Sequence, residues 1–211
     1  MSERKKSVEN LKEITANTLD YYNQKADGFF AGTINHDVEQ NISALLQNIK
    51  AASPLTILDV GCGPGRDLKT FSQRGHIAIG LEGAARFVEI ARSYSGCEVW
   101  FQNFINPVLP ANHFDGVYAN ASLFHVPSQV LPTVLQKYHT ALKPDGVLFS
   151  SNPHGINEEG WMNGRYGAYH DLSSWRDYMQ AAGFVELMHY YRPEGVPREQ
   201  QPWLASVWRK I

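Results

Sequence analysis

The sequence predicts an α/β fold in which helices cover both faces of a mostly parallel sheet. Short apolar runs alternate with stretches of helical periodicity from residue 55 to residue 151, which is typical of parallel strands joined by helices. A glycine-rich turn follows the first of these runs directly. Two later apolar runs have no helical stretch between them, so we expect them to pair antiparallel.

The expected parallel strands are short and nearly continuously apolar, as in strands that are covered on both faces. They comprise residues 55–60, 76–81, 98–101, 114–119 and 147–151. Helical spacing of apolar residues predicts helices over 66–74, 84–94, 129–142 and 173–182. The antiparallel pair comprises 185–191 and 204–208, and a long loop is expected from about residue 153 to residue 172.

The region before the first strand has helical periodicity of its own. Residues 8–25 and 36–51 are expected to form two helices, and Gly28 and Gly32 bracket a turn between them. We therefore interpret residues 1–211 as a single domain. It consists of an N-terminal helical cap (1–52) and an α/β core (53–211).

Composition excludes several classes of protein. The chain has 211 residues, 43% hydrophobic and 19% charged, and a formal net charge of −2, which disfavours a broad nucleic-acid-binding face. The segment MSERKKSVEN lacks the apolar centre of a secretory signal, and no apolar run approaches the roughly 18 residues of a membrane span. We expect a cytoplasmic monomer or homodimer, with Cys62 and Cys97 not forming a disulfide.

Three glycines at alternate positions follow the first strand. Gly61, Gly63 and Gly65 allow a tight turn and a close approach of the backbone to a ligand. Glu82 ends the next strand roughly 20 residues later, where an acid accepts hydrogen bonds from ribose hydroxyls. The spacing is G-x-G-x-G, whereas pyrophosphate binders have G-x-G-x-x-G, so a nicotinamide-dependent oxidoreductase is disfavoured.

The segments ILDVGCGPG and GLEG resemble motifs I and II of the class I S-adenosylmethionine-dependent methyltransferases, of the small bacterial type. The similarity extends from YYNQKADGFF to the last strand. It implies a Rossmann-like, seven-stranded sheet that ends in an antiparallel hairpin, and S-adenosylmethionine as cofactor. The residues that the resemblance places at the cofactor are Asp59, Gly61, Cys62, Gly63, Gly65, Glu82, Gly83, Asn103, Phe104 and Asn120.

The resemblance also assigns parts of the cofactor to these positions. Asp59 and the glycines surround the methionine portion, and Glu82 binds the ribose. Asn103 stands where the family often has an acid near the adenine, and Phe104 stacks beside the ring; the alternative for both is a plain turn. The segment 119–125, which includes Asn120, faces the sulfonium, and related small-molecule enzymes commonly carry a histidine at the position of His125.

Two segments outside a minimal core are expected to close over the substrate. One carries Tyr21 and Tyr22. The other is the expected loop 154–171, where Arg165 is suited to bind a carboxylate or another anion. Its Tyr169 is a further candidate for substrate binding, and the candidate catalytic residues are His125, Tyr166 and His170. The alternative is that the aromatic residues of this loop only seal the edge of the sheet, and that His125 is a packed residue.

The function predicted from these features is methyl transfer to a small-molecule acceptor through nitrogen, oxygen or sulfur. Alternatives are a module that binds the cofactor without catalysis, and an RNA methyltransferase. The tripeptide Asn152-Pro153-His154 resembles part of a nucleobase-methylating motif, but it follows the fifth strand, whereas that motif follows the fourth. The histidines and cysteines have no metal-binding spacing, so no metal is expected.

Overall fold

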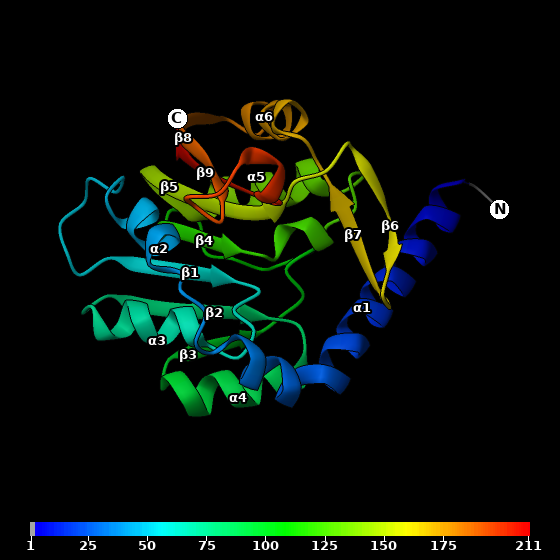
Figure 1. The fold of residues 1–211 in the computed structure, drawn as a ribbon, viewed down its shortest axis with the longest axis horizontal. Helices are drawn as coiled ribbons and strands as arrows, with labels where there is room; N and C mark the ends of the chain where they lie inside the picture. The colour runs from blue at the N-terminus through cyan, green and yellow to red at the C-terminus, as the bar shows by residue number, and fades with distance from the viewer. Residues whose placement is uncertain (1–2) are drawn as a thin grey trace.

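The computed structural model describes the backbone of residues 3–211 and the side chains of residues 10–211. Its centre is a seven-stranded sheet in the order β3-β2-β1-β4-β5-β9-β8 (Figure 1). The parallel strands are β1 (Thr56–Val60), β2 (Ile77–Glu82), β3 (Glu98–Phe101), β4 (Phe114–Asn120) and β5 (Leu142–Pro153). Strand β9 (Trp203–Lys210) is antiparallel to both β5 and β8 (Phe184–Arg192), which confirms the predicted fold.

Two apolar layers lie between the sheet and its helices. On one face, α2 (Glu39–Leu46), α3 (Arg66–Gln73) and α4 (Ala85–Ser95) pack against alternate strand residues such as Ile57, Tyr118 and Phe149. On the other face, α5 (Leu131–Ala141) and α6 (Leu172–Ala181) pack against residues such as Leu58, Val117 and Trp208. Because successive strand residues point to opposite faces, one strand contributes to both layers.

The N-terminal region differs from its prediction. One continuous helix, α1 (Glu3–Thr33), replaces the predicted helix that ends at residue 25 and the turn at Gly28 and Gly32. Each glycine costs a helix about 1 kcal/mol relative to alanine. Tertiary contacts offset this cost, because Ala26 is buried and Phe29 packs edge-on against Phe87 with the ring centroids 5.5 Å apart.

The segment predicted as a long loop is a two-stranded hairpin. Strands β6 (Glu158–Met162) and β7 (Arg165–Tyr169) pair antiparallel across Asn163 and Gly164, which both have positive φ, of 51° and 85°. An Asn-Gly pair between two strands is the residue choice that a tight hairpin turn requires. The sequence therefore contained the signal for this hairpin, and the prediction of a loop was wrong.

The remaining elements are two 3₁₀ turns, η1 (Leu123–His125) after β4 and η2 (Arg198–Gln200) between β8 and β9. Figure 1 shows α1 beside the β6–β7 hairpin, at the end of the sheet toward which the parallel strands point. Open α/β sheets bind ligands at this end. No helix in the described part of the chain is long and apolar enough to cross a membrane.

Candidate active site

The glycine loop connects β1 to α3. Gly61, Gly63 and Gly65 all have positive φ, of 65°, 52° and 86°, a conformation that side chains rarely adopt. A Cβ atom on Gly61 would lie 2.6 Å from Cβ of Ser122, and one on Gly65 would lie 2.9 Å from Cα of Ala91. A Cβ atom on Gly63 would meet no atom within 4 Å. The first and third glycines therefore permit close packing, and the middle one leaves open space beside the loop.

Glu82 ends β2 and is bound by backbone amides. Its Oε2 accepts a hydrogen bond from Gly63 N–H at 2.9 Å, and its Oε1 accepts from the N–H groups of Gly83 and Ala84 at 2.8 Å each. Burial raises the pKa of this carboxyl, whereas the three amides lower it. The donors hold the side chain in one orientation at the wall of a cavity.

Two aspartates and an arginine surround the same loop. Asp59, at the fourth position of β1, is buried, and its Oδ2 has no hydrogen-bond partner among the described residues. Burial, and then the neighbouring Asp67, raise the pKa of Asp59 well above its ordinary value. Arg66 forms an ion pair with Asp67 at 2.6 Å and donates a hydrogen bond to the carbonyl of Thr33 at 3.0 Å. Asp59 is thus an acceptor suited to a cationic donor.

A cavity of about 620 Å³ lies above the carboxyl ends of β1, β2 and β4. This volume is within the range of small-molecule and cofactor sites. Its walls come from α1, the glycine loop, the segment after β4, strand β7 and the start and end of the β8–β9 connection. The predicted site residues that line it are Tyr22, Asp59, Gly61, Cys62, Gly63, Glu82, Phe104, Asn120, His125 and Arg165.

A chain of hydrogen bonds crosses this cavity. Arg165 Nη1 lies 3.1 Å from the hydroxyl of Tyr22, which lies 2.8 Å from Nε2 of His125. Nδ1 of His125 lies 2.5 Å from the backbone oxygen of Tyr166. A carbonyl oxygen only accepts, so Nδ1 carries a proton and, in the neutral ring, Nε2 accepts the hydrogen bond from Tyr22. The chain connects α1, η1 and β7.

Burial sets the ionisation of this chain. Burial is the main cause that lowers the pKa of His125 to about 4, and the positive charge of Arg165 lowers it further. Burial also raises the pKa of Tyr22 to about 12, although Arg165 acts in the opposite direction. At pH 7 the imidazole and the phenol are therefore both neutral, and the guanidinium carries the charge.

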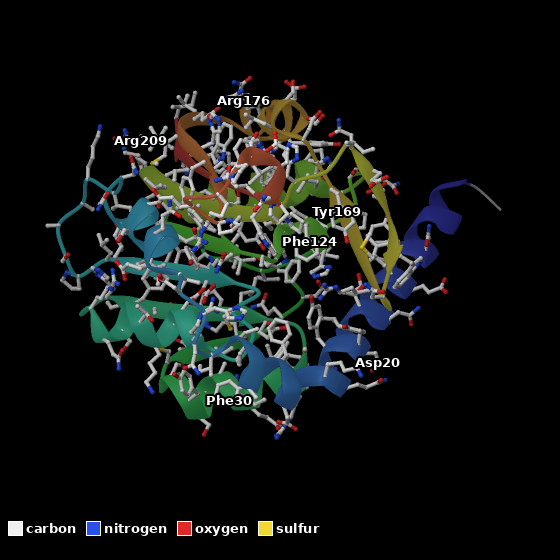
Figure 2. The ribbon with its side chains drawn as sticks, in the orientation of Figure 1. Asp20, Phe30, Phe124, Tyr169, Arg176 and Arg209 are labelled. Atoms are coloured by element: carbon white, nitrogen blue, oxygen red, sulfur yellow. The ribbon has the colours of Figure 1, made fainter. Side chains whose placement is uncertain are left out.

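Several predicted residues lie outside the cavity lining. Tyr166 points to the other side of β7 from Arg165, and its ring packs edge-on against Trp161 at 5.8 Å. The ring centroids of Tyr169 and Phe124 lie 6.1 Å apart. Both residues are labelled in Figure 2. His170 packs against Trp175 and Tyr178. The structure does not bring Tyr166, Tyr169 and His170 into the lining of the cavity. Alternation along β7 turns Tyr166 away from Arg165. Tyr169 is on the same face of β7 as Arg165, but its ring lies over Gly167 and against Phe124, and His170 packs on α6.

Four further predicted site residues lie outside the lining and form a turn or packing contacts instead: Asn103, Gly65, Gly83 and Tyr21. Asn103 uses its side-chain oxygen to accept the N–H of Ile105 at 2.9 Å, which forms a local turn. Gly65 packs on α4, and Gly83 approaches Leu19 of α1. Tyr21 faces Tyr22 edge-on, with the ring centroids 5.4 Å apart.

The structure adds lining residues that the sequence reasoning missed. They are Thr18, Leu19, Phe29, Thr33, His36, Asp37, Val38, Asn41, Pro64, Arg66, Asp67, Phe87, Ser151, Arg192, Pro193 and Trp203. Ala121, Ser122 and Phe124 also line the cavity and belong to the segment 119–125 that the family resemblance marked. Most of the missed residues come from α1, from the chain before α2 and from the β8–β9 connection, which no family motif marks. One signal was available: Arg192 and Trp203 flank a proline-rich connection at the carboxyl end of β8.

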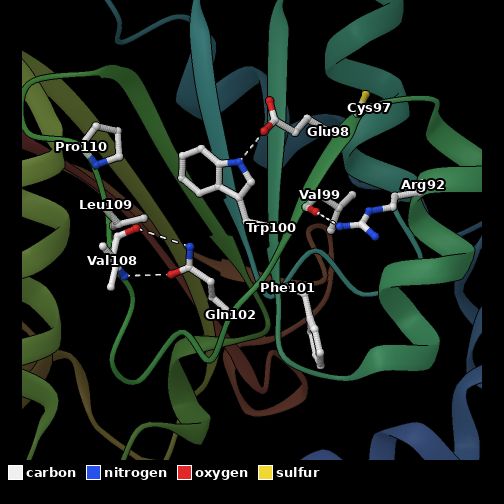
Figure 3. Close-up of a pocket in the computed structure, with 10 residues that line it drawn as sticks. All are labelled: Arg92, Cys97, Glu98, Val99, Trp100, Phe101, Gln102, Val108, Leu109 and Pro110. Atoms are coloured by element: carbon white, nitrogen blue, oxygen red, sulfur yellow. Dashed lines mark hydrogen bonds between the residues drawn. The ribbon is translucent and has the colours of Figure 1, made fainter.

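A second hollow, of about 750 Å³, lies on the outer side of the edge strand β3 (Figure 3). Trp100 Nε1 donates to Glu98 there at 2.7 Å, and Gln102 bonds the backbone of Val108. No predicted site residue lines this hollow. The described side chains also contain no group of three or more histidine, cysteine or acidic residues arranged to hold a metal ion.

Comparisons with known proteins agree with this geometry. The profile of a methyltransferase domain family matches residues 30–189. A ubiquinone biosynthesis O-methyltransferase of Haemophilus ducreyi is 35% identical over 105 residues, which cover 45% of this chain and 44% of that protein. A trans-aconitate 2-methyltransferase of Azoarcus is 28% identical over 54% of this chain and 45% of that protein. The matched segments thus span about half the length of these two relatives.

Solved structures with the same fold extend over nearly the whole chain. The 1,6-didemethyltoxoflavin-N1-methyltransferase of Burkholderia thailandensis, solved with S-adenosylhomocysteine, superposes with a TM-score of 0.78. The alignment covers 95% of this chain and 90% of that one, at 20% identity. The [4+2]-cyclase SpnF superposes with a TM-score of 0.70 at 16% identity, over 90% of this chain and 94% of that one. The family match covers residues 30–189 and includes the glycine loop and Glu82, which are in contact in the structure. The chain therefore belongs to the class I S-adenosylmethionine-dependent methyltransferases.

Proposed function

We propose that this chain transfers a methyl group from S-adenosylmethionine to a small-molecule acceptor through nitrogen, oxygen or sulfur. The observation that carries the proposal is that one cavity contains both Gly63 and Glu82 and the hydrogen-bonded pair Tyr22 and His125. Gly63 and Glu82 suit the methionine portion and the ribose of the cofactor, and Tyr22 and His125 suit a protic acceptor. A cavity that holds both sets of groups brings cofactor and acceptor into contact.

The residues present fit S-adenosylmethionine. The unpartnered Oδ2 of Asp59 suits the ammonium of the methionine portion, and the open space at Gly63 admits that portion close to the backbone. The rigidly held carboxylate of Glu82 suits the ribose hydroxyls. When bound, the cofactor supplies a methyl group on a sulfonium: the methyl–sulfur bond breaks with its electron pair going to sulfur, and a lone pair of the acceptor forms the new bond.

His125 would accept the proton that the acceptor loses. Its Nε2 faces the cavity and is bonded to the hydroxyl of Tyr22, so an acceptor O–H or N–H would take the place of that hydroxyl. The backbone oxygen of Tyr166 fixes the tautomer that leaves Nε2 free of a proton. An imidazole with a pKa of about 4 is a weak base, but it remains unprotonated throughout the physiological pH range.

Helix α1 and strand β7 lie over the cavity, and this arrangement favours a small acceptor over a polymer. The hydroxyl of Thr18 accepts a hydrogen bond from the N–H of Tyr166 at 3.1 Å, and Arg165 binds Tyr22, so α1 and β7 are joined above the site. The names of the relatives refer to ubiquinone biosynthesis, trans-aconitate and didemethyltoxoflavin, which are small molecules.

The test is a transfer assay with methyl-labelled S-adenosylmethionine and the purified protein. Panels of phenols, carboxylic acids, amines and thiols are compared with transfer RNA, and both the labelled fraction and the release of S-adenosylhomocysteine are measured. We expect label in at least one small molecule and its loss in Glu82→Ala. Label only in RNA, or binding of the cofactor without transfer to any acceptor, would contradict the proposal.

A further inference from the structure

Three arginines line the cavity, and their charges are balanced differently. Arg66 is paired with Asp67 at 2.6 Å. Among the described side chains, no carboxylate oxygen lies within 4.0 Å of Arg165 or of Arg192, and neither arginine takes part in an ion pair. Two cations without a counter-ion in a protein cavity indicate that the ligand carries negative charge.

The surroundings of Arg165 leave its charge uncompensated. Its one side-chain hydrogen bond is to the hydroxyl of Tyr22, and its guanidinium carbon lies 5.7 Å and 5.9 Å from the ring centroids of Tyr21 and Tyr22. Both contacts are with uncharged groups. A guanidinium has five N–H donors, and the hydrogen bond to Tyr22 occupies one of them. Arg165 therefore has donors left for a ligand beside His125.

Arg192 contributes a second cation from the other side of the fold. Its Nη2 donates to the backbone carbonyl of Asp37 at 3.1 Å, and its Nε is buried without a hydrogen-bond partner among the described residues. It ends β8 and lines the same cavity as Trp203. A guanidinium that is only partly hydrogen-bonded keeps its positive charge and further N–H donors for a ligand.

Four acids line the cavity, and none of them pairs with Arg165. Asp59, Asp67 and Glu82 surround the glycine loop, and Asp37 lies beside Arg192, from which its backbone carbonyl accepts a hydrogen bond. The part of the cavity around Arg165 and His125 therefore has a positive charge that no carboxylate of the described side chains within 4.0 Å balances. This charge argues against a cationic acceptor, because such a molecule would meet a fixed like charge.

We propose that the methyl acceptor is a small organic anion whose carboxylate is bound by Arg165, with Arg192 as a second cation in the cavity. This inference rests on the proposed function. The planar guanidinium matches a carboxylate with two parallel hydrogen bonds, and the adjoining rings of Tyr22 and Phe124 suit an apolar or planar carbon skeleton. The bound carboxylate would place another atom of the acceptor at Nε2 of His125.

The experiment uses the full chain saturated with S-adenosylhomocysteine. Calorimetry compares acids with their uncharged amides, in the pairs benzoate and benzamide, 4-hydroxybenzoate and 4-hydroxybenzamide, and succinate and succinamide, with phenyl phosphate as a further anion. We expect at least one acid to bind about 10-fold or more tightly than its amide, as a charge-assisted pair in a cavity provides. Equal affinities within every pair would overturn the inference, as would a preference for phenyl phosphate over every acid.

Three variants test whether Arg165 binds the carboxylate of the acceptor or only positions the hydroxyl of Tyr22. Arg165→Gln keeps an N–H donor for Tyr22 but removes the charge, and it should abolish the preference for the acid. Arg165→Lys keeps the charge and should retain part of the preference. Arg198→Gln removes an arginine outside the cavity, which stacks on Tyr191 at 3.5 Å, and should change nothing. If Arg165→Gln weakens acid and amide equally, Arg165 only positions Tyr22 and the inference is wrong.

Binding of S-adenosylhomocysteine is measured first for each protein. Failure to bind it would contradict the proposed function itself, before any acceptor is tested. Normal binding of S-adenosylhomocysteine without discrimination between acid and amide would contradict only the anionic acceptor. Melting temperatures of the variants show whether each one is folded.

Discussion

The hydroxyl of Tyr22 and Nε2 of His125 lie 2.8 Å apart, although 103 positions separate them in the chain. This hydrogen bond joins the N-terminal helix α1 to the turn that follows β4. The tautomer of His125 is fixed by its other nitrogen, which donates to the carbonyl of Tyr166, so Nε2 is the nitrogen that faces Tyr22 and the cavity. The proposed chemistry and the position of α1 therefore depend on the same pair.

His125→Gln should lower kcat for an acceptor that must lose a proton by about 10²- to 10⁴-fold, because the proton acceptor is lost. The affinity for S-adenosylhomocysteine should stay within about 2-fold, since the glycine loop and Glu82 are unchanged. Single-turnover assays together with calorimetry measure the two effects. A variant with unchanged kcat would show that His125 is a packed residue, as the alternative interpretation of the sequence holds.

Protonation of His125 should make the fold less stable in mild acid. Its pKa falls from 6.5 to about 4 on folding, so the unfolded chain takes up the proton first as the pH decreases. This contribution to stability is complete above about pH 6.5 and is lost as the pH falls toward 4, at about 1.4 kcal/mol per pH unit. Urea unfolding at pH 7.5 and pH 5.0 should give a smaller pH dependence for His125→Gln. An equal pH dependence of the unfolding free energy in the wild type and in His125→Gln would contradict the lowered pKa of His125.

Tyr22→Phe should loosen α1. The variant loses the hydrogen bonds to His125 and Arg165, which is expected to cost about 1–2 kcal/mol and to increase amide exchange along α1. Tyr21→Phe is the matched control, since the hydroxyl of Tyr21 makes no hydrogen bond within the described structure. Equal exchange in the two variants would mean that the hydroxyl of Tyr22 does not hold the helix.

Two glycines of the loop should respond differently to alanine. Gly65→Ala places a Cβ atom 2.9 Å from the backbone of α4 at a φ of 86°, and should destabilise the fold by about 3 kcal/mol or more. Gly63→Ala meets no atom and should cost about 1 kcal/mol, from its positive φ alone, yet weaken cofactor binding. Denaturant unfolding measures the stability of each variant, and calorimetry measures its affinity for the cofactor. A larger loss of stability in Gly63→Ala would contradict the packing at α4.

The sequence predicted the sheet, and its motifs marked the glycine loop and Glu82, which the fold brings to one cavity. Both follow from local patterns. The strand at 56–60, the glycine loop and Glu82 lie within 27 residues of one another, and their spacing carries the information. The hairpin of β6 and β7 was also predictable from Asn163-Gly164, but the density of polar aromatic residues favoured a loop. Local propensity at Gly28 and Gly32 was misleading, because packing of Ala26 and Phe29 maintains the helix there.

The acceptor part of the cavity was only partly predictable. His125, Tyr22 and Arg165 were each singled out, but the contact between them depends on how α1 crosses the edge of the sheet. Tyr166 and His170 are near these residues in sequence and face elsewhere, because alternation along β7 and the start of α6 decide their directions. Arg192 flanks a proline-rich connection that no family motif marks, and the fold places this residue in the lining of the cavity.

The most direct test of the central claim is calorimetric titration of the purified protein with S-adenosylmethionine and S-adenosylhomocysteine. Glu82→Ala is titrated in parallel, and NAD serves as the negative control. We predict binding of both adenosyl ligands, weakened in the variant by at least about 10-fold through loss of the ribose contacts, and no binding of NAD. Absence of adenosyl binding, or a preference for NAD, would contradict the assignment of the cofactor and leave only the fold.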